Sequence, residues 1–146
     1  MVPELTAPYR LLLVAACALI DDWKRILIAQ RPKGKKLEGL WEFPGGKLEP
    51  GESPEQTLVR ELDEELAIQI DPSNLTALTF ASYHYPEFHL LMPLFVCRHW
   101  RGVPNPLENQ AIAWVSISDL LRPDSAYPMP PADTPLIPAL RDFLET

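Results

Sequence analysis

Residues 46–68 read Gly-Lys-Leu-Glu-Pro-Gly-Glu-Ser-Pro-Glu-Gln-Thr-Leu-Val-Arg-Glu-Leu-Asp-Glu-Glu-Leu-Ala-Ile. The centre of this stretch carries a strong helix start. Ser53 suits the N-cap, Pro54 suits the first helical position, and Gln56 can complete a capping box with Ser53. These residues predict a helix that runs from Pro54 to Leu66.

Three carboxylates gather on one side of that helix. At 3.6 residues per turn, Glu61, Glu64 and Glu65 fall within an arc of roughly 100°. An apolar stripe lies beside them and can pack on a sheet; its members are Leu58, Leu62 and Leu66. Like charges at this spacing repel one another, and a divalent cation reverses the sign of the interaction. Oxygen ligands favour Mg²⁺, Mn²⁺ or Ca²⁺ over zinc.

A solvated acidic helix face is the simpler interpretation of such a cluster. The preceding loop weighs against it. Phe43-Pro44-Gly45-Gly46 and then Pro50-Gly51 is turn sequence, in which glycines permit a close approach of the backbone to a ligand. Because this loop leads directly into the acidic helix, the sequence favours a metal site over a solvated acidic face.

The same residues resemble the box that defines the Nudix family, Gly-x5-Glu-x7-Arg-Glu-U-x-Glu-Glu-x-Gly-U, where U is aliphatic. The positions that match are Gly46, Glu52, Arg60, Glu61, Leu62, Glu64 and Glu65. One position departs, because Ala67 stands where the family has a glycine that ends the helix in a left-handed conformation. The resemblance implies an α/β fold, the Nudix α/β/α sandwich with a mixed β-sheet. It also implies hydrolysis within the pyrophosphate of a nucleoside diphosphate linked to another group.

The resemblance assigns roles to the residues of the box. It implies metal ligation by the carboxylates of Glu61, Glu64 and Glu65 and by the carbonyl of Gly45. Glu52 would support the site, and Arg60 would anchor the loop by pairing with a carboxylate. Glu108, just before an expected strand, stands where the MutT branch of the family has a glutamate that serves the metal and the attacking water. A surface loop charge is the alternative for Glu108. The implied cofactor is Mg²⁺, with Mn²⁺ able to substitute.

Resemblance to the MutT branch covers nearly the whole chain and points to residues that bind the base. Arg31, Phe43 and Tyr85 match positions near the nucleotide, and Phe88 replaces an arginine. Asp133 stands in a Pro-Ala-Asp-x-Pro run where MutT has asparagine. An aromatic core role for Phe43, Tyr85 and Phe88, and a helix-capping role for Asp133, are the alternatives.

Asp133 also bears on which base is recognised. Guanine presents two neighbouring donors, N1–H and the 2-amino group, and an ionised carboxylate can accept both. A protonated Asp133 could take cytosine or an oxidised base in another orientation. We therefore expect cleavage of oxidised purine triphosphates, chiefly 8-oxo-dGTP, to the nucleoside monophosphate and pyrophosphate, which would cleanse the nucleotide pool. The alternatives are a pyrophosphohydrolase of CTP or modified pyrimidine triphosphates, and a nucleotide-binding module without turnover.

Composition sets the remaining expectations. The 146 residues fit one domain, 1–146, with 47% hydrophobic and 23% charged residues. The net charge of −7 disfavours nucleic acid polymers as partners. Cys17 and Cys97 lie in apolar runs and are expected as buried thiols. The run Leu11 to Ile20 is too short to span a membrane, and a second strand pattern follows it, so a β-hairpin explains it better than a signal peptide. We therefore expect no membrane association and a cytoplasmic location. We also expect a monomer or weak dimer.

The layout along the chain is a series of strands with three helices. Strands are expected at 10–21 and 24–31, paired as a hairpin, followed by loops at 32–42 and 43–53. The helix at 54–66 comes next, and then strands at 75–85, 88–100 and 111–115. A short helix at 117–121, a proline-rich segment and a last helix from about 135 to 144 complete the domain.

Overall fold

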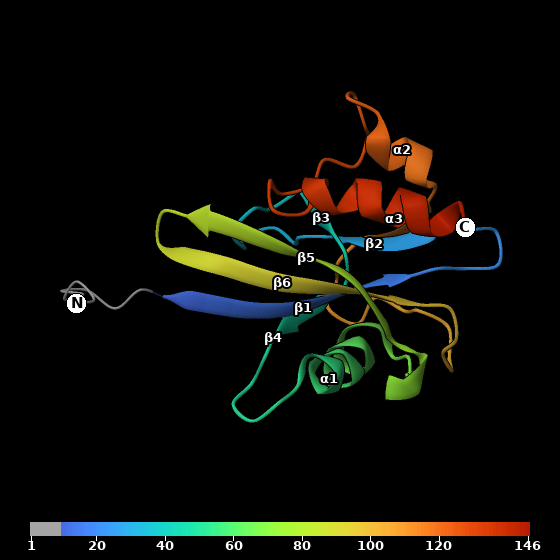
Figure 1. Ribbon diagram of the computed structural model, residues 1–146, viewed down its shortest axis with the longest axis horizontal. Helices are drawn as coiled ribbons and strands as arrows, with labels where there is room; N and C mark the ends of the chain where they lie inside the picture. Colours follow the sequence, from blue (N-terminus) through green and yellow to red (C-terminus); the bar gives the residue numbers. More distant parts are fainter. Residues whose placement is uncertain (1–9) are drawn as a thin grey trace.

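The computed structural model describes residues 10–146, and a four-stranded sheet lies at its centre (Figure 1). Its strands, in spatial order, are β4 (Gly45–Lys47), β1 (Leu11–Leu19), β6 (Phe88–Cys97) and β5 (Thr76–Tyr85). Strand β1 runs parallel to β6, whereas the other pairs are antiparallel. The sheet is therefore mixed, as expected.

A second sheet holds the strand that the sequence assigned to a hairpin with β1. It consists of β3 (Trp41–Glu42), β2 (Ile26–Gln30) and β7 (Ile112–Val115), all antiparallel. The expected hairpin of 10–21 with 24–31 is wrong, because only an isolated bridge, Ile20 to Ile26, joins the two segments. Both edges of β1 are already hydrogen-bonded, to β4 and to β6, so β2 must find partners elsewhere.

Helix α1 (Pro54–Leu66) has the bounds that the sequence predicts. The capping box is complete: the Gln56 amide donates to Ser53 Oγ at 3.1 Å, and the Ser53 amide donates to Gln56 Oε1 at 2.8 Å. The helix ends at Ala67, whose φ of 57° and ψ of 34° are left-handed. The alanine thus takes the conformation for which the family uses glycine.

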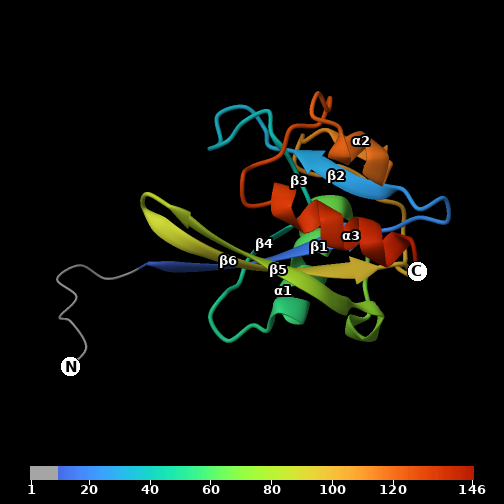
Figure 2. The same ribbon diagram turned by 45° about the horizontal axis from the view of Figure 1, so that its top comes forward.

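Helices cover both faces of the central sheet (Figures 1 and 2). On one face, the α1 leucines pack against β1 at Ala15, Cys17 and Leu19. On the other, helix α3 (Ile137–Leu144) joins a core that includes Ala16 and Ala18 of the same strand. This arrangement confirms the α/β/α sandwich. Cys17 and Cys97 are buried free thiols, as expected.

The other elements follow the expected order with shifted ends. Strands β5 and β7 lie where they were predicted, and β6 ends at Cys97 rather than at residue 100. The predicted short helix is α2 (Ile117–Leu121), and a 3₁₀ turn, η2 (Thr134–Leu136), precedes α3. The short strands β3 and β4 and the 3₁₀ turn η1 (Pro72–Asn74) were not predicted. Within residues 10–146, no helix is long and apolar enough to cross a membrane.

Candidate active site

Arg60 ties the loop before α1 to the helix itself. Its guanidinium donates to both carboxylate oxygens of Glu52, at 2.8 and 2.9 Å, and to Glu61 Oε1 at 2.8 Å. It also donates to the Lys47 carbonyl at 3.2 Å and lies 3.4 Å from Glu64 Oε2. These hydrogen bonds from Arg60 hold the pKa of Glu52 at about 2. The structure thus contains the pairing of Arg60 with a carboxylate that the resemblance implied.

The paired glycines of β4 allow two close approaches. A Cβ on Gly45, whose φ is +153°, would collide with the carbonyl of Ala15 in β1. A Cβ on Gly46 would lie 2.6 and 2.7 Å from the carboxylate oxygens of Glu61. Glycine at both positions therefore seats β4 against β1 and leaves room for Glu61 above it.

The C-terminal half of α1 brings further carboxylates to the same side. Glu65 is partly buried, and its pKa is raised to about 9, first by burial and then by the charge of Glu61. The charge of Glu108 raises it further. Glu108 is exposed on the loop between β6 and β7. This loop is hydrogen-bonded to the end of α1, because the Leu107 amide donates to the Glu65 carbonyl at 3.0 Å. The structure thus places Glu108 near Glu65.

The residues at this end fit a hard divalent cation by their chemistry. Across residues 10–146, no group of three or more acidic, histidine or cysteine side chains is arranged to hold a metal ion. Arg60 instead contacts Glu61 and Glu64, and Glu64 is 55% exposed. Burial first, and then repulsion from Glu61 and Glu108, raise the pKa of Glu65. A bound cation would relieve that repulsion, and all the side-chain donors are oxygens.

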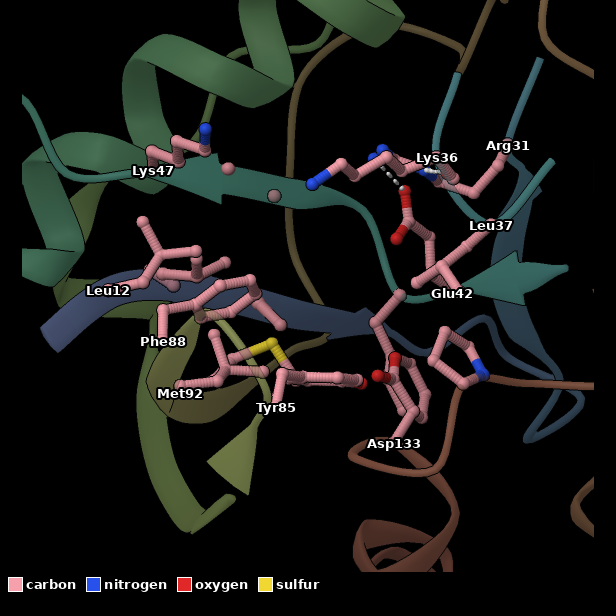
Figure 3. A pocket seen from close by; sticks show the side chains of 18 of the residues that line it. Leu12, Arg31, Lys36, Leu37, Glu42, Lys47, Tyr85, Phe88, Met92 and Asp133 are labelled. Atoms are coloured by element: carbon pink, nitrogen blue, oxygen red, sulfur yellow. Dashed lines mark hydrogen bonds and ion pairs between the residues drawn. The ribbon is translucent and has the colours of Figure 1, made fainter. Parts of the chain in front are cut away.

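A cleft of about 660 Å³ runs from the glycines of β4 to the segment before η2. Figure 3 shows Lys47 at one end and Tyr85 with Asp133 at the other. An apolar wall lies between them, made by alternate residues of β1 and β6: Leu12, Val14, Phe88, Leu90 and Met92. All five predicted base-binding residues line this cleft: Arg31, Phe43, Tyr85, Phe88 and Asp133.

Two carboxyl groups and one guanidinium meet at the far end of the cleft. Asp133 is only 6% exposed, and its pKa is raised to about 7, first by burial and then by the charge of Glu42. The Phe43 backbone amide and Arg31 counter this shift. Burial also raises the pKa of Glu42, whose carboxylate lies 3.4 Å from Arg31 Nη1. Asp133 therefore exists in both protonation states near neutral pH.

The structure excludes a capping role for Asp133 and places the three aromatic residues both on the cleft wall and against the core. Asp133 precedes η2 but makes no side-chain capping hydrogen bond, so the capping alternative is wrong. Phe43 is 4% exposed, and it belongs to the core as well as to the cleft wall. The rings of Tyr85 and Phe88 lie 5.2 Å apart on the same wall.

Sequence reasoning missed other residues of the cleft, notably Glu42, Lys36 and Lys47. Glu42 could have been predicted from its position between Trp41 and Phe43, in the run of residues that precedes the Nudix-like box. Lys36 comes from a loop whose sequence gives no sign of its position, because only the fold brings it over the cleft.

Comparison with known proteins finds a family and several relatives of this chain. A family model described as the NUDIX domain matches residues 10–140. The chain is 38% identical over 132 residues to the CTP pyrophosphohydrolase of Escherichia coli strain K12, covering 84% of this chain and 86% of that protein. It is 33% identical over 128 residues to the 8-oxo-dGTP diphosphatase of the same strain, covering 88% and 95%. A solved MutT structure, from work on Aliivibrio salmonicida and Vibrio cholerae, matches with a TM-score of 0.74 and 32% identity, covering 92% and 99%.

Proposed function

The chain belongs to the Nudix family of pyrophosphohydrolases, which need a divalent metal, and on that premise we propose that it is a Mg²⁺-dependent nucleoside triphosphate pyrophosphohydrolase acting chiefly on 8-oxo-dGTP. The products would be the nucleoside monophosphate and pyrophosphate. One observation carries the proposal: a single cleft joins the glycines beside Glu61 to the buried Asp133. A nucleotide in it would have its phosphates at the acidic helix and its base at Asp133.

At the phosphate end, Glu61, Glu64, Glu65, Glu108 and the Gly45 carbonyl would hold the metal. Mg²⁺ bound there, or Mn²⁺ in its place, would neutralise phosphate oxygens and acidify a water.

The chain's own side chains would do the rest at this end. Arg60 fixes Glu52 and Glu61 relative to the loop, which orients the carboxylates before the substrate arrives. Lys47 lines the cleft next to Gly46 and would attract the phosphates. The exposed carboxylate of Glu108 would accept a proton from the attacking water.

At the base end, Asp133 would distinguish guanine-type bases by its charge. An ionised carboxylate accepts both the N1–H and the 2-amino group of guanine, whereas cytosine offers one donor and one acceptor on that edge. Tyr85 and Phe88 would supply flat apolar surface for the base, and Arg31 would support the polar end. The 8-oxo-dGTP diphosphatase relative supports this choice of base.

A second candidate substrate is CTP or a modified pyrimidine triphosphate. It is favoured by the pKa of about 7 at Asp133, since the protonated acid can donate to the acceptor of cytosine. The relative at 38% identity that is named CTP pyrophosphohydrolase supports it as well. The two candidates share the phosphate chemistry and differ only at the base end of the cleft.

The decisive test is a panel of kcat/KM values for 8-oxo-dGTP, dGTP and CTP, with pyrophosphate detected directly. We expect 8-oxo-dGTP to give the highest value and pyrophosphate to appear in step with monophosphate. A panel led by CTP would select the second candidate. If the wild-type protein turns over no triphosphate in Mg²⁺, the remaining interpretation is a module that binds nucleotides without hydrolysing them.

The proposal extends to domain organisation, cellular location and oligomeric state. Residues 1–146 would form one Nudix domain that works in the cytoplasm on free nucleotides, and the buried free thiols Cys17 and Cys97 suit a reducing compartment. It would act as a monomer or weak dimer, away from membranes and nucleic acid polymers. Light scattering on a gel-filtration column tests the oligomeric state.

A further inference from the structure

The chain is acidic, yet four of its 13 lysine and arginine residues fall in one short loop. With a net charge of −7, the protein as a whole repels an anionic nucleotide. It has five lysines, Lys24, Lys33, Lys35, Lys36 and Lys47, and three of these fall in the run Arg31-Pro32-Lys33-Gly34-Lys35-Lys36. With Arg31, that run of six residues carries four positive charges and no negative one.

The fold brings this run to the cleft. Arg31 and Lys36 both line the cleft, and Figure 3 shows them side by side above Glu42. The loop is held by its own hydrogen bonds: the Arg31 side chain donates from Nε to the Lys36 carbonyl at 3.1 Å, and the Gly39 amide donates to the Arg31 carbonyl at 3.1 Å. Lys33 and Lys35 lie in the exposed bend between these anchors. Their charges therefore lie beside the cleft without being part of its wall.

Most of this positive charge is not neutralised within the protein. Lys36 Nζ lies 3.3 Å from Glu87 Oε2, but the two side chains are 79% and 72% exposed, so water screens the pair. Among the described residues, no ion pair engages Lys33 or Lys35. Glu87 itself lines the cleft from the turn between β5 and β6. The loop thus presents a positive field at the opening, with Glu87 as its local counter-charge.

We propose that the basic loop, residues 31–36, is an electrostatic guide that captures the polyphosphate of the incoming nucleotide and directs it into the cleft. This inference rests on the proposed function, since it concerns how that substrate enters. A clustered charge of one sign at a cleft raises association rates by about 10- to 1,000-fold, and the effect fades with ionic strength. The Debye length is about 10 Å at 0.1 M salt and about 3 Å at 1 M, so distant lysines act only at low salt.

The proposal makes opposite predictions for charges of opposite sign. Lys33→Gln with Lys35→Gln removes two cations that do not line the cleft. We expect kcat/KM for the triphosphate to fall roughly three- to tenfold at about 20 mM salt and to approach the wild-type value at about 500 mM. Glu87→Gln removes the counter-charge, and it should raise kcat/KM about twofold at low salt.

A matched control makes the same change in net charge away from the cleft. Arg122→Gln with Arg141→Gln lowers the net charge by the same two units, after α2 and on α3, where the arginine side chains are 63% and 42% exposed and pair with Asp124 and Asp142. We measure kcat and KM for all three variants and the wild type across the salt range at constant free Mg²⁺. The proposal predicts that the control follows the wild type. It is overturned if control and loop variants lose kcat/KM equally, or if the loss in the loop variant does not depend on salt.

Two further outcomes are distinguished in the same experiment. A wild-type protein without pyrophosphate release would count against the proposed function and not against the loop. A DNA oligonucleotide should inhibit the wild type more than the loop variant at low salt, because the loop acts through its charge; equal inhibition of the two proteins would overturn the proposal. Circular dichroism melts of each variant confirm that the fold is kept.

Discussion

Replacing Ala67 by glycine should stabilise the protein. Ala67 ends α1 with φ of 57° and ψ of 34°, and its amide donates to the Asp63 carbonyl at 3.0 Å. A left-handed conformation costs an ordinary L-residue about 1–2 kcal/mol, a cost that glycine avoids. The greater freedom of glycine in the unfolded chain returns about 0.5–1 kcal/mol of this gain. We therefore expect Ala67→Gly to raise the free energy of unfolding by about 0.5–1 kcal/mol.

Urea denaturation at 25 °C measures this effect. The midpoint should rise with an unchanged m-value, and the melting temperature should rise by about 1–4 °C. Ala139→Gly is the matched control, because Ala139 lies inside α3, where the same exchange should cost about 1 kcal/mol. A decrease in stability for Ala67→Gly, or the same sign for both variants, would refute the reasoning about the left-handed cap.

The remaining predictions concern the active site. Because Asp133 has a pKa of about 7, its carboxyl group is protonated below that pH and ionised above it. The ratio of kcat/KM for 8-oxo-dGTP to kcat/KM for CTP should therefore rise as the pH is raised through 7. If this ratio has the same pH dependence in Asp133→Asn, the titration belongs to another group. Glu64→Gln should lower kcat by about two orders of magnitude or more. Its melting temperature should stay close to that of the wild type, since the Glu64 side chain is 55% exposed. Full activity of this variant would exclude Glu64 as a metal ligand. Gly46→Ala should keep the fold and lose activity, because the three atoms nearest to the added Cβ belong to the flexible carboxylate end of Glu61. Gly45→Ala meets backbone atoms instead and should cost about 2 kcal/mol or more. Thermal melts and initial rates of the two variants separate these effects, and equal destabilisation would contradict the distinction.

The acidic helix was predictable because its signals are local. Ser53, Pro54 and Gln56 act within one turn, and the structure reproduces the bounds that they predict. The hairpin of the first two strands was wrong for the opposite reason. Both segments have good strand patterns, but the pairing of β1 with β6 joins residues more than 70 positions apart, and no local signal reports it.

The cleft was predictable only in part. Arg31, Phe43, Tyr85, Phe88 and Asp133 were found through resemblance to a family, and the structure places all of them on the cleft wall. The composition of the wall itself, and the contacts of Glu42 and Lys36, depend on how the two sheets pack. The pKa of Asp133 could not be foreseen, since burial and a neighbouring carboxyl set it.

The account depends most on where the triphosphate is cut. Incubation of 8-oxo-dGTP with the wild-type protein and Mg²⁺, followed by ³¹P NMR of the products, answers this directly. We predict monophosphate and pyrophosphate in equal amounts, with no turnover after the metal is chelated. Diphosphate with inorganic phosphate as products, or turnover that persists without a divalent ion, would contradict the assignment of the acidic helix to pyrophosphate release.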